Sequence, residues 1–287
     1  TLKEDSETLE EVVVVGYGTQ KKVNLTGSVS SVSAKDIQDV PTSNTASLLQ
    51  GRMPGLVISQ NGGQAGKEDM EVRVRGVGTF GNNNPMVLID GVEGTLSQMS
   101  DIPAADIENI SVLKDAASAA IYGVRAANGV ILITTKKGKA GKISVNYSGS
   151  YTLQKPMLPT YIDSYQWALM KNDVAPDTYD ATALQKLQDG SDPDHYANTN
   201  WLDEVFRNAS MHQHHLSVSG GNEHTQYMTS ISYSNQEGIM KKTGAEKFSF
   251  RSNVDSNIGR FNFGLNVSGN KNNVDQPASI APSGETS

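Results

Sequence analysis

The feature that most constrains this chain is a strict alternation of apolar and polar residues in its second half. Side chains that alternate with a period of two residues point to opposite faces of a β-strand. One face of the first segment is apolar, and similar faces recur at 227–234, 248–255 and 261–268, with a weaker one at 212–219. The pattern predicts long antiparallel strands with one apolar and one polar face. The first apolar face runs through Ile143, Val145, Tyr147, Gly149, Tyr151 and Leu153.

Both a membrane barrel and a water-soluble β-sandwich have such strands, and alternation alone leaves the two open. The segments approach the roughly 9–11 residues that a tilted strand needs to cross a bilayer. The polar face is Ser, Asn and Arg, and aromatic residues gather near segment ends, as in outer-membrane barrels. Tight turns at 220–223 and 256–259 alternate with longer connections at 155–207 and 234–246. Together these details favour transmembrane hairpins.

Composition excludes several classes of protein. The chain has 287 residues, with 24 Lys plus Arg against 31 Asp plus Glu and a net charge of −7. This acidic balance argues against nucleic acid as the partner, because phosphate binding needs a basic surface. Cysteine is absent, so neither disulfides nor thiolate metal sites can form. No run approaches the roughly 18 apolar residues of a membrane helix.

A barrel cannot close with so few strands, because an open edge in hydrocarbon leaves backbone groups unpaired. Closed membrane barrels begin at about eight strands. We therefore expect the chain to be a fragment of a longer protein. Its Pro- and Ser-containing end, Gln276 to Ser287, is expected to begin a further loop.

The first half has short, mixed segments that predict a compact α/β unit. A short helix capped by Ser43 is expected to run to Gln50, and an Ala-rich helix to run from Asp115 to Tyr122. Strands are expected where β-branched runs lie between Gly and Asn turns. These are Leu56–Ser59, Glu71–Arg75, Met86–Ile89, Ile107–Leu113 and Gly129–Thr135.

A series of motifs follows in a fixed order along nearly the whole chain. They are 11–18 (EVVVVGYG), 48–55 (LLQGRMPG), 74–76 (VRG), 80–85 (FGNNNP), 87–92 (VLIDGV), 112–117 (VLKDAA), 119–123 (AAIYG), 125–138 (RAANGVILITTKKG) and 216–221 (LSVSGG). Any one motif could arise by chance, but their order is specific. In this order they resemble the SusC/RagA family of TonB-dependent outer-membrane transporters.

The resemblance implies an α+β plug domain followed by antiparallel transmembrane β-strands of an incomplete β-barrel of the 22-stranded type. Residues 1–10 are then a linker or the remnant of an upstream domain, 11–20 a TonB-box-like segment, 21–141 the plug and 142–287 the first barrel strands. The expected location is the outer membrane of a Gram-negative bacterium, with the plug in the barrel lumen and the TonB-box segment in the periplasm.

The implied function is TonB-dependent import of a nutrient, with an oligosaccharide favoured, and with the plug gating the lumen. The implied partners are TonB with ExbB and ExbD, a SusD-like surface lipoprotein, the oligosaccharide or peptide ligand and outer-membrane lipid. No enzyme activity, cofactor, metal or nucleic acid is implied. A peptide importer, and a receptor for signalling or adhesion, remain as alternatives, and so does a secreted soluble binding module.

The valine run near the start has two interpretations. It is a buried plug strand, or it is the TonB box, an extended segment that pairs through main-chain hydrogen bonds with an incoming strand. The resemblance and its place ahead of the plug favour the second. The predicted TonB-interacting residues are Glu11, Val12, Val13, Val14, Val15, Gly16, Tyr17 and Gly18.

Residues 76–81 (GVGTFG) satisfy a GxGxxG pattern. A dinucleotide site needs a helix directly after this pattern, but turn residues follow it here. We interpret it as a plug surface that faces the lumen, where amides suit hydroxyl-rich or peptide ligands. A plain turn is the alternative. The predicted substrate-facing residues are Thr79, Phe80, Asn82, Asn83 and Asn84. Arg73 and Arg75 are expected to pair with acidic residues of the barrel wall, or else to face solvent.

Two clusters invite a metal-site interpretation that the pattern does not support. His212 and His214 share a strand face, but neither they nor the neighbouring His215 have an evident third ligand, so a lumen-facing or interfacial role is expected. The acidic residues Asp189, Asp192 and Asp194 lack the spacing of an EF-hand and are expected in a solvated loop. No catalytic motif is present.

Overall fold

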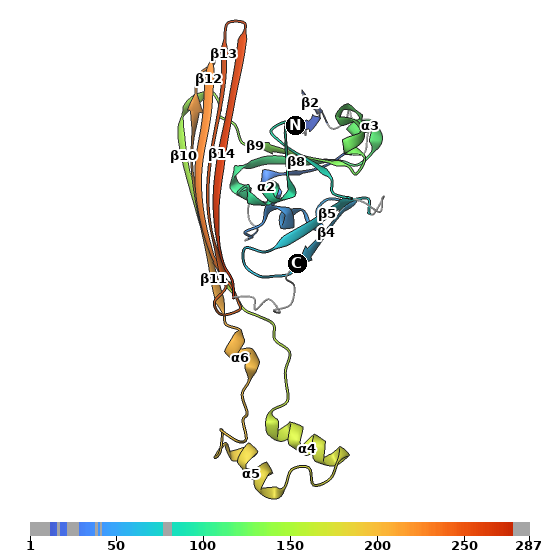
Figure 1. The fold of residues 1–287 in the computed structure, drawn as a ribbon. Coiled ribbons are helices and arrows are strands. Elements are labelled where there is room, and N and C mark those ends of the chain that lie inside the picture. Colours follow the sequence, from blue (N-terminus) through green and yellow to red (C-terminus); the bar gives the residue numbers. More distant parts are fainter. Residues whose placement is uncertain are drawn as a thin grey trace, which may run out of the picture.

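A computed structural model describes residues 12–15, 18–21, 29–37, 40, 42–76 and 82–277. Most of these residues form two bodies (Figure 1). The first, here called the N-terminal domain, comprises the described residues from 29 to 138. The second, here called the long sheet, is a five-stranded sheet in the order β10-β11-β12-β13-β14. In Figure 1 the long sheet stands as a tall curved ribbon with the N-terminal domain against one face.

Every neighbouring pair in the long sheet is antiparallel and consecutive in sequence. This confirms the hairpins that the alternation predicts, and the apolar face is the exposed one. Tyr147, Ile231 and Phe263 are exposed, whereas Ser230 and Asn253 of the polar face are buried. The strands are β10 (Gly141–Gln154), β11 (Ala209–Gly221), β12 (Thr225–Glu237), β13 (Gly244–Ile258) and β14 (Phe261–Asp275).

The N-terminal domain is built on a second five-stranded sheet, in the order β3-β8-β9-β6-β7, and a separate β4-β5 hairpin. Among the described strands, only β6 and β9 pair in parallel. The predicted strands are present, whereas β3 and β7 were not predicted. The bounds are β3 (Val29–Ser33), β4 (Leu56–Asn61), β5 (Asp69–Val74), β6 (Met86–Ile89), β7 (Val92–Gly94), β8 (Ile107–Leu113) and β9 (Val130–Thr135).

One hydrophobic core unites both sheets of the N-terminal domain. β9 is apolar on both faces from Val130 to Ile133, and β8 is buried from Ile110 onward, so these two strands take central positions in the sheet. Ile110 and Ile131 are fully buried there, and Leu49 from a short helix and Val72 from β5 join the same cluster. Because the β4-β5 hairpin shares this core, it belongs to the same folded unit.

Short helices connect these strands, and several of them begin at a side-chain cap. They are α1 (Ala34–Ile37), η2 (Thr45–Leu49), α2 (Leu96–Asp101), η3 (Ala104–Asp106), α3 (Ala116–Ala119) and η4 (Ala120–Ala126). The predicted Ala-rich helix is present as α3, which Asp115 caps, and it is followed directly by η4. The predicted cap of η2 was wrong by one residue, because the side chain of Asn44, not Ser43, accepts from the Ala46 N–H. Asn44 is fixed there because its Nδ2 also donates to the Glu68 carbonyl, 2.8 Å away.

The long connection between β10 and β11 contains three helices that the sequence pattern did not predict. They are α4 (Ser164–Val174), α5 (Ala181–Asp189) and α6 (Trp201–Val205). Asp163 and Asp180 cap α4 and α5. In Figure 1 these helices lie beyond the end of the long sheet that is opposite the β13-β14 turn. None of the described helices is both long and apolar enough to cross a membrane.

The valine run forms β1 (Val12–Val15), which pairs with β2 (Gly18–Lys21) in an antiparallel hairpin. Within the described residues, this hairpin is a sheet of its own and joins neither of the larger sheets. The extended conformation predicted from the β-branched residues is therefore confirmed. Glu11, Gly16 and Tyr17 lie outside the described residues.

Candidate functional site: the seam between the N-terminal domain and the long sheet

The polar face of the long sheet meets the N-terminal domain along an interface that we call the seam. Two of its ion pairs place a carboxylate of the domain against a basic side chain of the sheet, and His215 of the sheet contacts Asp106 of the domain. A third ion pair, Lys137 with Asp255, has the opposite polarity. Amides also cross the seam: Gln213 Nε2 donates to the Thr42 carbonyl at 3.0 Å, and Gln236 Nε2 to Glu68 Oε1 at 3.0 Å.

Among the aspartates of these contacts, Asp106 is the most buried and Asp90 is the next. Asp90 follows β6 in a turn with φ of 51°, and the Thr135 N–H and Oγ1 donate to its two oxygens at 2.8 and 2.7 Å. Arg251 of β13 lies 3.4 Å away, and the two side chains are 6% and 11% exposed. Asn253 donates to Thr135 Oγ1 and to the Lys136 carbonyl, both at 2.9 Å. The end of β9 is thus fixed to β13.

Asp101, the last residue of α2, is held by three side chains of the long sheet. Its carboxylate accepts from Lys247 Nζ at 2.8 Å, Asn270 Nδ2 at 2.7 Å and Asn272 Nδ2 at 3.1 Å. Lys247 also donates to the carbonyl of Ser100 at 3.0 Å. We call this group of four side chains the Asp101 clasp. It joins one helix end to two strands, β13 and β14.

The three neighbouring histidines divide between the two faces of β11. His215 Nε2 lies 2.7 Å from Asp106 Oδ1 in the seam, and these side chains are 11% and 3% exposed. His212 and His214 lie on the apolar face with their ring centroids 5.5 Å apart. Tyr147 Oη contacts His214 Nδ1 at 2.8 Å, and the ring of Tyr233 lies 5.7 Å from that of His212.

The chain leaves the N-terminal domain by a close approach to β12. A Cβ at Gly138 would come within 2.4 Å of the backbone N and O of Tyr227, so only glycine fits there. Two residues earlier, burial lowers the pKa of Lys136, although the nearby carboxylates of Asp106 and Glu108 oppose this shift. A half-buried lysine and a glycine contact thus mark the point at which domain and sheet diverge.

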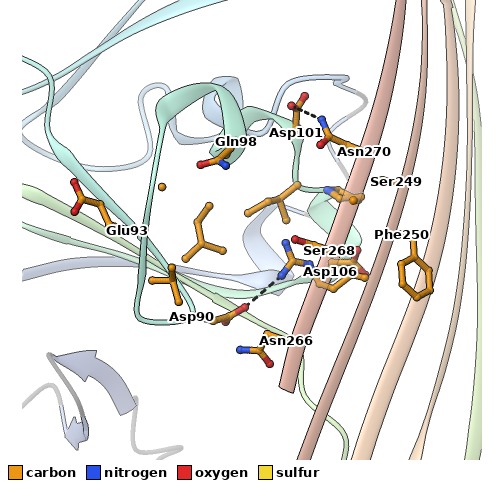
Figure 2. A pocket seen from close by; sticks show the side chains of 17 residues that line it. Asp90, Glu93, Gln98, Asp101, Asp106, Ser249, Phe250, Asn266, Ser268 and Asn270 are labelled. Carbon is orange, nitrogen blue, oxygen red and sulfur yellow. Dashed lines mark hydrogen bonds and ion pairs between the residues drawn. The ribbon is translucent and has the colours of Figure 1, made fainter. Parts of the chain in front are cut away.

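Several cavities lie along the seam. One, here called the Arg251 cavity, has a volume of about 290 Å³ and lies between β7, α2 and strands β13 and β14. Figure 2 shows Asp90, Asp101 and Asn266 around it, with dashed contacts at Asp101–Asn270 and at Asp90. A second, here called the Gln236 cavity, also has about 290 Å³ and is lined by Glu68, Ser97 and Asn272. Polar side chains of both bodies face these cavities.

The arginines predicted to contact the barrel wall lie within the N-terminal domain. Arg73 forms an ion pair with Glu71 on its own strand. Arg75 follows β5 with φ of 59°, and its N–H donates to the Gly55 carbonyl at 2.9 Å. Burial lowers the pKa of Lys114, and the positive charge of Arg75 lowers it further. Among the described residues, the ion pairs to the long sheet use other side chains.

The predicted substrate-facing loop is described only in part. Thr79 and Phe80 lie outside the described residues. Asn82 Oδ1 accepts from the Asn84 N–H at 2.9 Å, which is a turn contact, and both side chains are exposed. Asn83 is half-buried beside them. The asparagines therefore shape a turn and still present exposed amides.

Sequence reasoning missed the acidic half of the seam. Asp90 lies in the turn between β6 and β7, whereas Asp101 and Asp106 lie in the connection between β7 and β8, and the three share no regular spacing. The basic half did leave a signal, because Lys247 and Arg251 stand on a strand face that is otherwise rich in Ser and Asn. A charge on a face that becomes covered needs a partner, so these two residues could have been singled out.

Comparisons with known proteins agree with this architecture. The family model described as TonB-dependent Receptor Plug Domain matches residues 21–130. TonB-dependent receptor P26 of Formosa agariphila is 42% identical over 258 residues, covering 88% of this chain and 26% of that protein. TonB-dependent receptor SusC of Bacteroides thetaiotaomicron is 38% identical over 264 residues, covering 88% and 25%. The chain spans about a quarter of the length of these curated relatives.

Solved structures give the same assignment. The RagAB peptide importer in its open-open state matches with a TM-score of 0.79 and 28% identity, over 93% of this chain and 33% of that one. The siderophore receptor PirA from Acinetobacter baumannii matches in fold, with a TM-score of 0.56 over 86% of this chain and 32% of that one. The chain belongs to the SusC/RagA family of TonB-dependent receptors and contains the plug domain followed by antiparallel strands.

Proposed function

We propose that the protein imports a nutrient across the outer membrane of a Gram-negative bacterium in a TonB-dependent manner. In this proposal the long sheet is part of a barrel wall of the 22-stranded type, and the N-terminal domain is the plug that closes its lumen. The observation that supports it most is the contrast between the faces of the long sheet. Phe263 and Leu265 are exposed on one face, whereas Lys247 and Arg251 on the other are paired with the domain.

The apolar face has the character of a lipid-facing surface. An aromatic row crosses it near the end that leads to α4–α6: the ring centroids of Tyr233 and Phe248 are 4.6 Å apart, and Tyr147 and His214 stack at 6.2 Å. Outer-membrane barrels place such residues at the boundary between hydrocarbon and headgroups. We therefore assign this end of the sheet to the outer leaflet, and α4–α6 to an extracellular loop.

The seam has the character of a contact that opens without unfolding the wall. A buried ion pair adds little net stability, because desolvation offsets the attraction between the charges. Polar side chains also find new partners in water once they separate. A plug held by Asp101, Asp106 and Asp90 can therefore move when force is applied to its N-terminal end.

We assign the reception of that force to the segment Glu11 to Gly18. A TonB strand would add to β1 through main-chain hydrogen bonds, with ExbB and ExbD supplying energy from the inner membrane. The pairing of β1 with β2 supports this role, because β1 already adopts the strand conformation that augmentation requires. A SusD-like lipoprotein is the proposed lid on the outer side.

The proposed ligand is an oligosaccharide that contacts the loop of Thr79, Phe80 and Asn82 to Asn84. The exposed amides of Asn82 and Asn84 support this choice, since amides both donate to and accept from hydroxyl groups. A peptide is the second candidate, because the chain resembles the RagAB peptide importer with a TM-score of 0.79. Arg75, which lies beside Lys114, is the proposed contact for a wall carboxylate on strands that this chain does not contain, and Arg73 is proposed to contact the same part of the wall.

Uptake by cells that produce the full-length protein tests the proposal. Radiolabelled oligosaccharide and oligopeptide pools are offered separately, in strains with and without a functional TonB. We expect the protein in the outer-membrane fraction and uptake of one pool only when TonB is present. TonB-independent uptake of both pools, or a freely soluble full-length protein, would contradict it.

A further inference from the structure

The Asp101 clasp lies between cavities that follow one another along the same two strands. In the register of β13 and β14, Lys247 pairs with Asn272 and Ser249 with Asn270. The Gln236 cavity ends at the Lys247–Asn272 row, and the Arg251 cavity begins at the Ser249–Asn270 row. Asp101 lines both, and it is held by residues of both rows. The clasp is therefore the partition between them.

A second closure follows in the next rows toward the β13-β14 turn. Arg251 lines the Arg251 cavity and pairs with Asp90, which also lines it. One row further, Asn253 is buried and donates to Thr135. Figure 2 shows this end of the cavity, with the dashed contact at Asp90 on the side of the cavity away from Asp101. The cavity reaches one row past Arg251, to Asn266, which pairs with Asn253. The Asp101 clasp therefore bounds one end of the cavity, and the Asp90–Arg251 pair narrows it just before the other end.

Both closures consist of side chains that can rotate. Lys247 has four rotatable methylene bonds, and Arg251 is equally long, so each can swing aside without moving the backbone. No large apolar side chain needs to leave a core, because the contacts are ionic and amide. Two cavities of about 290 Å³ each would then join. A third, of about 530 Å³, also borders Asp101 and Lys247 beside β10 to β12.

We propose that the seam is a latent route for small hydrophilic solutes, closed by the Asp101 clasp and by the Asp90–Arg251 pair, while the N-terminal domain stays in place. This inference rests on the proposed function, because it requires the long sheet to be a barrel wall. The solutes are neutral molecules of about monosaccharide size, since the lining is made of hydroxyls, amides and paired charges. Larger nutrients require movement of the whole domain and hence TonB.

The test uses the full-length receptor reconstituted in liposomes without TonB, with swelling rates in glucose and in a trisaccharide. The variants are Lys247→Met, Arg251→Met and the double variant. Both substitutions lie in β13 of the long sheet, so the N-terminal domain is unchanged. The control is Lys271→Met, which removes a lysine from the exposed apolar face of β14 in register with Phe248.

We expect the double variant to admit glucose at least tenfold faster than the wild-type receptor, and each single variant to admit it less than threefold faster. The trisaccharide should remain excluded. The inference is overturned if the double variant is no more permeable to glucose than Lys271→Met, or if it admits both sugars equally, because the domain has then left the lumen. If the methionine variants do not fold, Lys247→Gln with Arg251→Gln gives the same comparison.

The outcome separates the two proposals. Retention of TonB-dependent uptake by the wild-type receptor, together with an impermeable double variant, rejects the solute route alone. A full-length protein that does not insert in membranes at all rejects the proposed function, and the route with it.

Discussion

The Asp90 carboxylate accepts hydrogen bonds from both the N–H and the hydroxyl of Thr135, so its two oxygens are fixed before the sheet contributes Arg251. The residues Asp90 and Arg251 are 161 positions apart in sequence. The turn after β6 and the end of β9 therefore form a preorganised acceptor. The long sheet adds one guanidinium to it.

Asp90→Asn should destabilise the N-terminal domain more than Arg251→Met does. Asparagine has one acceptor oxygen in place of two, so it loses one of the two hydrogen bonds accepted from Thr135 and leaves Arg251 without its charge partner. Breaking a buried pair costs about 3 kcal/mol or more, which corresponds to a loss of about 100-fold in protection. Hydrogen exchange of β9 in the full-length receptor measures this. Equal protection in Asp90→Asn and wild type would contradict the assigned role of the carboxylate.

Gly138→Ala should displace the chain where it leaves the N-terminal domain. Its Cβ would meet the Tyr227 backbone at 2.4 Å, and backbone atoms cannot turn aside as a side chain can. We expect faster proteolysis between the domain and β10 and a lower yield of folded receptor. Gly269→Ala is the matched control, because nothing lies within 4 Å of its Cβ position. Similar losses in both variants would refute the contact.

Val14→Pro should abolish energised uptake and leave outer-membrane insertion intact. Proline removes a backbone N–H from β1 and cannot continue a strand ladder, while the long sheet and the domain core are untouched. Val14→Thr keeps the N–H and a β-branched side chain, so it should retain uptake. Uptake and ligand binding are measured in parallel on cells. Full uptake by the proline variant would show that β1 does not receive the TonB strand.

The turn after α5 should loosen in acid. Hydrogen bonds from His195 and then Lys186 hold the pKa of Asp192 below its usual range. A lowered carboxyl pKa stabilises the folded turn above the unfolded pKa of about 3.9, and this stabilisation is lost as the pH falls through the folded value. A spin label at Asp194→Cys should gain mobility below about pH 4.

The control for that experiment is the spin-labelled Asp194→Cys protein that also carries Asp192→Asn. It should make the label mobile at every pH, because the charge partner of Lys186 is absent throughout. A label whose mobility rises with acid equally in both proteins would mean that Asp192 does not hold the turn.

Local patterns made much of the fold predictable. The strand faces of β10 to β14 follow from alternation alone, because a period of two residues is a property of each strand. The Ala-rich helix that begins after Asp115 is equally local, because it follows from helix propensity. The cap of η2 was placed at Ser43 instead of Asn44, since both residue types cap helices and the choice depends on the distant contact with Glu68.

The acidic half of the seam could not be predicted, because it depends on which residues of the long sheet meet which connection of the N-terminal domain. Asp101 is 169 residues from Asn270, and nothing in its neighbourhood distinguishes it from other acidic residues. Arg73 pairs with Glu71 on the same face of its own strand. Its predicted contact with the barrel wall stays a prediction.

The central claim is that the N-terminal domain lies against the polar face of the long sheet in the membrane-embedded receptor. The chain has no cysteine, so Asp101→Cys can be combined with Asn270→Cys or with Val267→Cys in the full-length protein. A short bismaleimide applied to outer membranes should cross-link the Asp101→Cys, Asn270→Cys pair on the polar face. It should leave the Asp101→Cys, Val267→Cys pair unlinked, because Val267 lies on the apolar face. Cross-linking of neither pair, or of both pairs equally, would contradict the claim.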